Sequence, residues 1–190
     1  MKIVKSFEDI PQFPSPPAPI AFSLGTYDGV HLGHQSLFQE LKKRGTAVVL
    51  TFTNHPLEVL NPDAAPPLID TLEQRLRRME THGIDLVIAI PFTPELAAMS
   101  YDAFIQKIRS HLPFHSLILG EGDAFGHKRL GNEQNLRPFA QKLGIELIYL
   151  PKTTHAGETV SSRRIRELIE KHEYEQAFEL LGRPKGLKVW

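Results

Sequence analysis

The sequence has 190 residues, 41% of them hydrophobic and 23% charged, and its 22 basic residues balance 22 acidic ones. This length and composition predict one compact domain, and the charge balance excludes a broadly basic nucleic-acid-binding coat or a polyanionic tail. The absence of cysteine excludes disulfides, thiolate zinc sites and cysteine nucleophiles. No apolar run approaches the ~18 residues that span a bilayer. We therefore expect a soluble, cytoplasmic protein without a membrane or nucleic-acid partner.

Short aliphatic runs alternate along the chain with segments of helical spacing. The runs predict five buried strands, at residues 20–24, 47–52, 86–90, 117–119 and 145–150. The helical spacing predicts helices at residues 37–41, 72–79, 104–112, 136–143, 164–172 and 174–181, with the last one ended by Gly182. This alternation predicts an α/β fold: a Rossmann-like, doubly wound parallel sheet of five strands with helices on both faces.

Two connections are longer than such a sheet requires. Residues 53–70 are rich in proline, and residues 120–132 are rich in glycine and charge. Both follow predicted strand ends, where open parallel sheets bind their ligands, so both are interpreted as binding loops. A further proline-rich segment, residues 11–19, is interpreted as a stiff connection to the first strand, with a polyproline recognition strip as the alternative.

The segment Gly25-Thr-Tyr-Asp-Gly-Val-His-Leu-Gly-His34 joins the first predicted strand to a helix. Its free backbone N–H groups and the positive end of the helix dipole predict an anion site. His31 and His34 share a face of the helix, and Gly33 leaves no side chain between them. Such a pair, neutral or protonated, suits stabilisation of charge on a phosphoryl group without a covalent protein nucleophile. The alternative is that His34 packs in the core and His31 caps a turn; a zinc site would lack a third ligand.

A second polar cluster, Val160-Ser-Ser-Arg-Arg-Ile-Arg166, opens a later helix. Ser161 or Ser162 can cap this helix, and three arginines follow in its first turn: Arg163, Arg164 and Arg166. Each cation there opposes the helix dipole by ~0.3 to 1 kcal/mol, so the cluster requires a compensating anion. The alternative is a solvated helix face, in which ion pairs four residues apart explain part of the arginine cluster: Arg163 with Glu167 and Arg166 with Glu170. We favour a phosphate clamp, in which arginine forks and capped N–H groups bind phosphate oxygens.

Together these motifs resemble the FMN adenylyltransferase module of bacterial FAD synthetases, within the H-x-G-H nucleotidyltransferase superfamily. Residues 25–34 are similar to the family pattern G-x-[FY]-D-G-V-H-x-G-H, and Leu50-Thr-Phe-Thr-Asn-His-Pro56 resembles T-F-x-P-H-P. Further family segments are similar to residues 91–100, 119–121, 158–166 and 180–184. The likeness therefore runs along most of the chain.

The resemblance implies transfer of AMP from ATP to FMN, with release of FAD and pyrophosphate and with Mg²⁺ on the triphosphate; it names no metal-ligating residue. It implies catalytic roles for His31, His34 and Arg166. The ATP-binding residues implied are Gly25, Tyr27, Asp28, Gly29, His31, His34, Ser161, Ser162, Arg164 and Arg166. The flavin-binding residues implied are Asn54, His55, Glu121, Phe125 and Asn132.

Three departures from the family pattern bear on the substrate. Asn54 stands in place of a proline, Gly122-Asp123 in place of an acidic and an aromatic residue, and Arg163 in place of a threonine. The first two lie on the acceptor side, so ATP use is better defined by the resemblance than the acceptor is. Two alternatives stay open: adenylyl or cytidylyl transfer to another phosphorylated acceptor, such as phosphopantetheine or nicotinate mononucleotide, and a non-catalytic nucleotide- or flavin-binding module.

The resemblance also predicts the domain organisation. Residues 1–182 are expected to form the nucleotidyltransferase domain, and residues 183–190 a C-terminal tail, with the family's riboflavin kinase domain absent. The sequence makes no prediction of oligomeric state.

Overall fold

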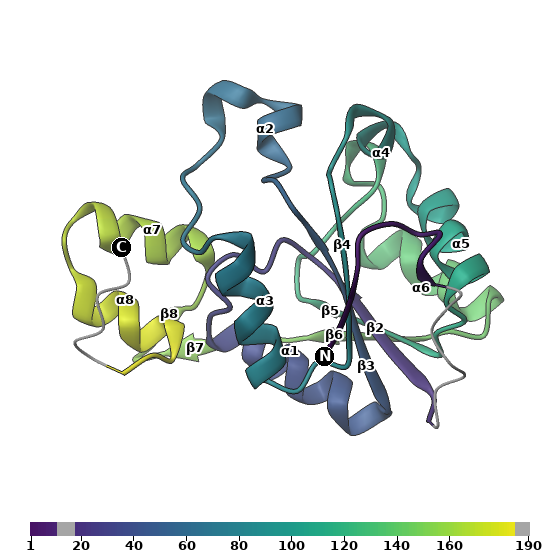
Figure 1. Ribbon diagram of the computed structural model, residues 1–190, viewed down its shortest axis with the longest axis horizontal. Coiled ribbons are helices and arrows are strands. Elements are labelled where there is room, and N and C mark those ends of the chain that lie inside the picture. Colours follow the sequence, from purple (N-terminus) through teal and green to yellow (C-terminus); the bar gives the residue numbers. More distant parts are fainter. Residues whose placement is uncertain (11–17, 185–190) are drawn as a thin grey trace.

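The computed structural model describes residues 1–10 and 18–184, and its centre is a parallel sheet (Figure 1). Six strands form this sheet in the order β1-β4-β3-β2-β5-β6. Their bounds are Lys2–Val4 (β1), Ile20–Leu24 (β2), Thr46–Phe52 (β3), Leu86–Ile90 (β4), Ser116–Gly120 (β5) and Glu146–Leu150 (β6). Every residue of β2, β3 and β4 is buried, because helices cover both faces of the central strands.

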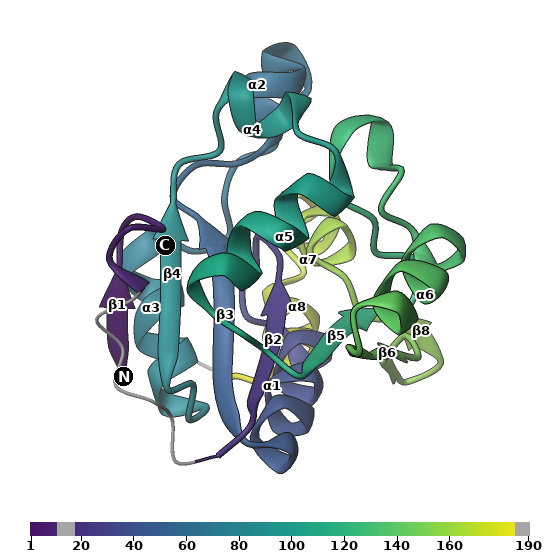
Figure 2. The ribbon, with the colours of Figure 1, turned by 90° about the vertical axis from the view of Figure 1, so that its right-hand side faces the viewer.

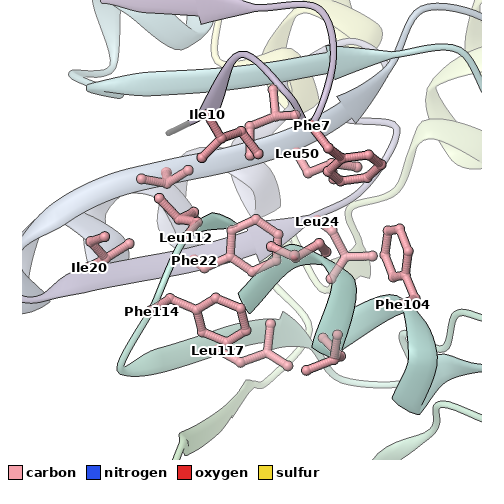
Figure 3. Packing of buried hydrophobic residues seen from close by; sticks show 14 of the residues in the cluster. Phe7, Ile10, Ile20, Phe22, Leu24, Leu50, Phe104, Leu112, Phe114 and Leu117 are labelled. Carbon is pink, nitrogen blue, oxygen red and sulfur yellow. The ribbon is translucent and has the colours of Figure 1, made fainter. Parts of the chain in front are cut away.

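Alternate residues of these strands point into two separate cores. On one face, α1 (Leu32–Arg44) and α3 (Leu72–Thr81) pack through Phe38, Leu41 and Met79 against Val49 and its neighbours. On the other face, α5 (Tyr101–His111) and α6 (Glu133–Lys142) pack against a larger, aromatic-rich cluster. Figure 3 shows part of this cluster, including the labelled Phe22 and Phe114, whose rings stack with their centroids 4.8 Å apart.

A third core holds the C-terminal helices together. It is formed by α7 (Ser162–Glu170) and α8 (Tyr174–Leu181), which pack on each other and on Ile69. A short antiparallel hairpin, β7 (Thr154–His155) and β8 (Glu158–Thr159), leads into α7. In Figure 1 the α7–α8 pair lies on the opposite side of the molecule from α5 and α6.

The chain order of the strands fixes where a ligand can bind. From β2 the chain moves to β3 and β4 on one side, and later to β5 and β6 on the other. The switch point is therefore the carboxyl end of β2 and β5, where open α/β sheets bind ligands. Two short helices, α2 (Leu57–Leu60) and α4 (Pro94–Ala98), follow β3 and β4 and project together beyond this edge of the sheet (Figure 2).

The predicted α/β architecture is confirmed, with all five predicted strands and all six predicted helices at their expected places. The predicted sheet of five strands was one strand short of the six observed. The missing strand, β1, has only three residues and lies at an edge with Ile3 exposed, so it shows no buried run. The connection 53–70 contains α2 and a 3₁₀ turn (Pro62–Ala64), and 120–132 contains a 3₁₀ turn (His127–Arg129). Gly182 ends α8 with a left-handed φ of 62°, as predicted. The proline-rich segment at residues 11–19, interpreted as a stiff connection or a polyproline recognition strip, lies largely outside the described residues.

Within the described part of the chain, no helix is long and apolar enough to cross a membrane.

Candidate active site

A cleft of about 840 Å³ opens at the carboxyl edge of the sheet, at the switch point between β2 and β5. Its walls come from the segments that follow five strands, β2 to β6, and from the start of α7. One half is polar and includes both predicted histidines. The other half is apolar, with phenylalanines contributed by the last residue of β3 and by the segments after β4 and β5. A single cleft therefore offers neighbouring places for a charged and an aromatic group.

The turn between β2 and α1 forms the floor of the polar half. Tyr27, Gly29 and Val30 all have positive φ angles, of 51°, 83° and 42°. Gly25 allows the Tyr27 ring to fold back, since a Cβ at position 25 would lie 3.2 Å from that ring. The Tyr27 hydroxyl is buried and donates to Ser23 Oγ at 2.7 Å, so the ring lines the cleft while the hydroxyl is engaged beneath it.

His31 and His34 stack on each other at the start of α1. Their ring centroids are 3.6 Å apart and their planes differ by 16°. His31 is also the N-cap of the helix, because its Nδ1 accepts from the His34 backbone N–H at 3.4 Å. A neutral His31 then carries its proton on Nε2. The cap, which the sequence suggested as an alternative to a functional role, therefore fixes the tautomer and orients the ring.

Both imidazoles are neutral at pH 7. Burial lowers the pKa of His31 to about 4, against the opposing effect of the Asp28 carboxylate. Burial, and next the neighbouring His31, hold the pKa of His34 well below its usual range. His34 Nδ1 is buried and has no hydrogen-bond partner among the described residues. The pair can therefore serve as oriented hydrogen-bonding groups rather than as two cations.

The start of α7 faces the histidine turn and is held to it by Asp28. Ser161 caps α7 by accepting from the Arg164 N–H, and Ser162 Oγ donates to the Asp28 carbonyl at 2.8 Å. Arg166 Nη2 donates to Asp28 Oδ2 at 2.7 Å, and Arg166 Nε donates to the Pro67 carbonyl at 2.9 Å. These bonds use two of the five guanidinium N–H donors and leave others for a ligand.

The apolar half of the cleft is lined by aromatic rings. Phe104 and Phe125 meet edge to face at 6.0 Å, and Phe52 and Phe92 meet in the same way at 5.1 Å. Aromatic rings at these separations form a wall on which a flat ligand ring can pack.

Two further polar side chains, His55 and Glu121, line the cleft. His55 Nδ1 accepts from the Leu57 N–H at 3.1 Å, and burial, followed by the charge of Arg166, lowers the pKa of His55. Glu121 Oε2 accepts from the Lys152 N–H at 3.3 Å. The structure thus brings His55, Glu121 and Phe125 together in the cleft.

Comparison with known proteins gives the family. The model for FAD synthetase matches residues 14–164. The chain belongs to the FAD synthetase family.

Several curated relatives are called bifunctional riboflavin kinase/FMN adenylyltransferase. One from Buchnera aphidicola is 30% identical over 97% of this chain and 60% of its own, and one from Escherichia coli K12 is 28% identical over the same shares. One from Listeria monocytogenes is 32% identical over 87% of this chain and 54% of its own. The chain thus spans about 60% of the length of the first relatives.

Solved structures share the architecture. A Streptococcus pneumoniae protein, described as a macrolide-efflux protein, superposes with a TM-score of 0.82 at 25% identity over 96% of this chain and 60% of that one. A pantoate-beta-alanine ligase from Francisella tularensis superposes with a TM-score of 0.65 at 17% identity over 99% of this chain and 82% of that one, which shows a common fold alone.

Four residues that the family resemblance placed at the site do not line the cleft. Gly29 faces inward, since a Cβ there would meet Leu181 and Ile69 at 3.0 to 3.2 Å. Arg164 pairs with Glu158 at 2.8 Å, away from the cleft. The other two serve the backbone: Asn54 bonds both the N–H and the carbonyl of Phe92, and Asn132 caps α6.

The remaining departures from the family pattern have structural explanations. Gly122 adopts a φ of 84°, and Asp123 accepts from the Gly120 N–H at 2.8 Å; burial raises the pKa of this carboxyl. Arg163 is 89% exposed and pairs with Glu167 as predicted. The solvated-face alternative paired Arg166 with Glu170, but in the structure Arg166 pairs with Asp28.

Sequence analysis missed three buried charged residues behind the site. Arg75 Nη1 donates to the Thr26 carbonyl at 2.7 Å, and Arg183 Nη2 donates to the Gly29 carbonyl at 2.7 Å and to the Asp70 carboxylate at 2.5 Å. The burial of Arg75 could have been inferred from the sequence, since Arg75 lies three residues after Leu72 and four before Met79, on the apolar face of α3. Arg183 also packs into the domain although it falls in the predicted tail; the division at residue 182 stays a prediction.

Proposed function

We propose that this chain transfers AMP from ATP to FMN, giving FAD and pyrophosphate. The observation that carries the proposal is the neutral, stacked pair His31 and His34. This pair shares with Arg166 a cleft that continues into the apolar half lined by aromatic rings. Membership of the FAD synthetase family and the names of the relatives support the same activity.

In this proposal the triphosphate lies between the N-termini of α1 and α7. Both helix ends attract anions through their dipoles and free N–H groups. His31 Nε2–H is an oriented donor for an oxygen of the α-phosphate, and His34 flanks it. Ser161, Ser162 and Arg166 lie where the β- and γ-phosphates would follow, with Gly25 and the Tyr27 ring as the floor.

The chemical step is a displacement at the α-phosphorus. A phosphate oxygen of FMN forms a bond to that phosphorus, the bond to the bridging oxygen of the β-phosphate breaks, and pyrophosphate leaves with the electron pair. No protein nucleophile forms a covalent bond, so the side chains act by positioning and by stabilising developing charge. Donors that remain on Arg166 suit the leaving pyrophosphate.

Magnesium enters this scheme with the substrate. The described residues contain no cluster of three or more His, Cys, Asp or Glu side chains that could hold a metal ion. We propose that ATP binds as its magnesium complex, in which the cation neutralises phosphate charge. We further propose that the protein acts in the cytoplasm on small molecules, in keeping with its lack of cysteine.

FMN would occupy the apolar half. Its isoalloxazine ring matches the aromatic wall that includes Phe125, and His55 and Glu121 supply polar groups in the same cleft. The flavin phosphate would then point toward the histidine pair, where the transfer takes place.

An acceptor panel tests the proposal. The purified chain is incubated with ATP and Mg²⁺ together with FMN, phosphopantetheine or nicotinate mononucleotide, and adenylylated products are identified by mass. We expect FAD from FMN and no comparable product from the other two. A faster product from another acceptor would move the function to that acceptor, and binding of ATP and FMN without any product would favour a non-catalytic binding module.

A further inference from the structure

The turn that carries the histidines has all of its carbonyl groups occupied by the protein. Each backbone carbonyl from Thr26 to His31 accepts a hydrogen bond. Two of these bonds are local, from the Val30 and Gln35 N–H groups to the carbonyls of Tyr27 and His31. The remaining four carbonyls accept from side chains: Thr26 from Arg75 at 2.7 Å and from Thr51 Oγ1 at 3.1 Å, and Asp28, Gly29 and Val30 from Ser162, Arg183 and Gln35 at 2.7 to 2.9 Å.

This turn requires external support because its backbone is strained. Val30 is β-branched and has a φ of 42°, a conformation that such residues rarely adopt, and Tyr27 also has a positive φ. Strained conformations of this kind persist only where the surrounding structure imposes them. Here the support comes from residues distant in the sequence, on α3, on α7 and just after α8.

Arg183 is the most remote of these supports. It is only 4% exposed, and it joins the Gly29 carbonyl to the fully buried Asp70 carboxylate. The backbone N–H of Asp70 donates to Asp28, which in turn holds Arg166. The contacts of Arg183 therefore reach both sides of the phosphate end of the cleft: the histidine turn through Gly29 and Arg166 through Asp70 and Asp28.

Stability alone is a poor explanation for this buried cation. Arg183 Nε and Nη1 and Asp70 Oδ1 are buried without a hydrogen-bond partner among the described residues. A buried ion pair whose remaining polar atoms are unsatisfied returns little of its desolvation cost, and well-packed apolar residues often replace such pairs without loss. What an apolar residue cannot replace is the bond to the Gly29 carbonyl.

We propose that Arg183 is a positioning residue for nucleotidyl transfer: by holding the Gly29 carbonyl it keeps His31 and His34 in the geometry that the reaction uses. The inference rests on the proposed function, and it adds a residue that touches no substrate. It makes turnover depend on the stretch that follows α8, which directly contacts the histidine turn.

The test compares Arg183→Met and Arg183→Lys with Arg77→Met. Arg77 is a matched control, because it lies on α3, its side chain is 76% exposed and it pairs with Glu73 along its own helix. FAD formation is measured well below each thermal midpoint and is divided by the folded fraction. The imidazole ring signals of His31 and His34 are recorded by NMR in the same samples.

We expect Arg183→Met to lower kcat by about 10- to 100-fold, the range expected when catalytic groups are displaced by roughly 1 Å. The KM for ATP should change by less than about threefold, because Arg183 does not line the cleft, and the ring signals should move. The kcat of Arg183→Lys should lie between those of the parent and Arg183→Met, since the lysine ammonium keeps the charge beside Asp70 but lacks the planar guanidinium fork. Arg77→Met should match the parent in both measurements.

A kcat per folded molecule within twofold of the parent overturns the proposal, even if the thermal midpoint falls. Unmoved ring signals also overturn it, since Arg183 would then not be holding the histidine turn. If Arg183→Met does not fold, Arg183→Lys decides by the same two measurements. If the parent itself makes no FAD, the proposed function has failed, and the ring signals alone decide whether Arg183 positions the pair.

Discussion

His31 has two roles in this structure, as the N-cap of α1 and as a ring in the cleft, and substitution can separate them. Asparagine is among the best N-cap residues and can accept from the His34 N–H, whereas alanine cannot. His31→Asn therefore keeps the cap and removes the imidazole, and His31→Ala removes both. Any difference between the two variants measures the cap, and any shared loss measures the ring.

The magnitudes follow from the contacts. Loss of an N-cap costs about 1 kcal/mol, which lowers the thermal midpoint of a domain of this size by about 2 to 4 °C. Loss of an oriented donor to a developing phosphoryl charge costs ~10² to 10³ in rate, about 3 to 4 kcal/mol. We expect the midpoint to fall in His31→Ala and to stay near that of the parent in His31→Asn, while turnover falls by a similar large factor in both.

The assay follows FAD formation at saturating ATP and FMN, corrected for the folded fraction, beside a thermal melt. Thr71→Ala is the matched control, because Thr71 caps α3 with a capping box and does not line the cleft. It should lose stability and keep turnover. If His31→Asn turns over within about threefold of the parent, His31 acts only as a cap and the proposed role of its imidazole is refuted.

Further substitutions test the remaining parts of the site. The pKa of His31 is about 4 in the folded state and about 6.5 in the unfolded state, so the unfolded chain binds more protons between these pH values. The free energy of unfolding should therefore fall by ~3 kcal/mol on acidification through that window. Urea titrations should show a shallower fall in His31→Asn, and an equal fall in parent and variant would exclude the pKa shift. Arg166→Lys should lower kcat/KM for ATP by at least about tenfold, since one ammonium cannot reproduce the bonds to Asp28, Pro67 and phosphate, and unchanged kinetics would assign this arginine to a surface role. In calorimetry, Phe125→Ala should weaken FMN binding several-fold, by ~0.5 to 1.5 kcal/mol, and leave ATP binding unchanged. Phe139→Ala, outside the cleft, is the control. Equal losses of affinity for FMN and ATP would remove Phe125 from the acceptor site.

The strands and helices could be predicted because their signals are local. Buried aliphatic runs and apolar residues three or four apart report on burial of the residues themselves, and the central strands are buried along their whole length. The edge strand β1 escaped the same reasoning because two of its three residues are exposed. The location of the cleft was also predictable, since the turn after the first long strand must lie at the carboxyl edge of the sheet.

The partners of the polar side chains could not be predicted in the same way. The i,i+4 rule offered only Glu170 as a protein partner for Arg166, but Arg166 reaches Asp28, 138 positions earlier in the chain. Asn54 was assigned to the flavin, but it bridges to Phe92 on the neighbouring connection. Such pairings depend on how distant elements pack, and a single sequence carries no periodic pattern for them.

The central claim is that the cleft moves the adenylyl group of ATP onto FMN, and the fate of two isotopic labels tests it directly. The chain is incubated with FMN, Mg²⁺ and ATP that carries distinct labels on its α- and γ-phosphates, and the products are separated. We predict that the α-label appears in FAD and the γ-label in pyrophosphate, in equal amounts. A γ-label on any flavin product, or FMN that stays unlabelled while ATP is consumed, would contradict adenylyl transfer by this site.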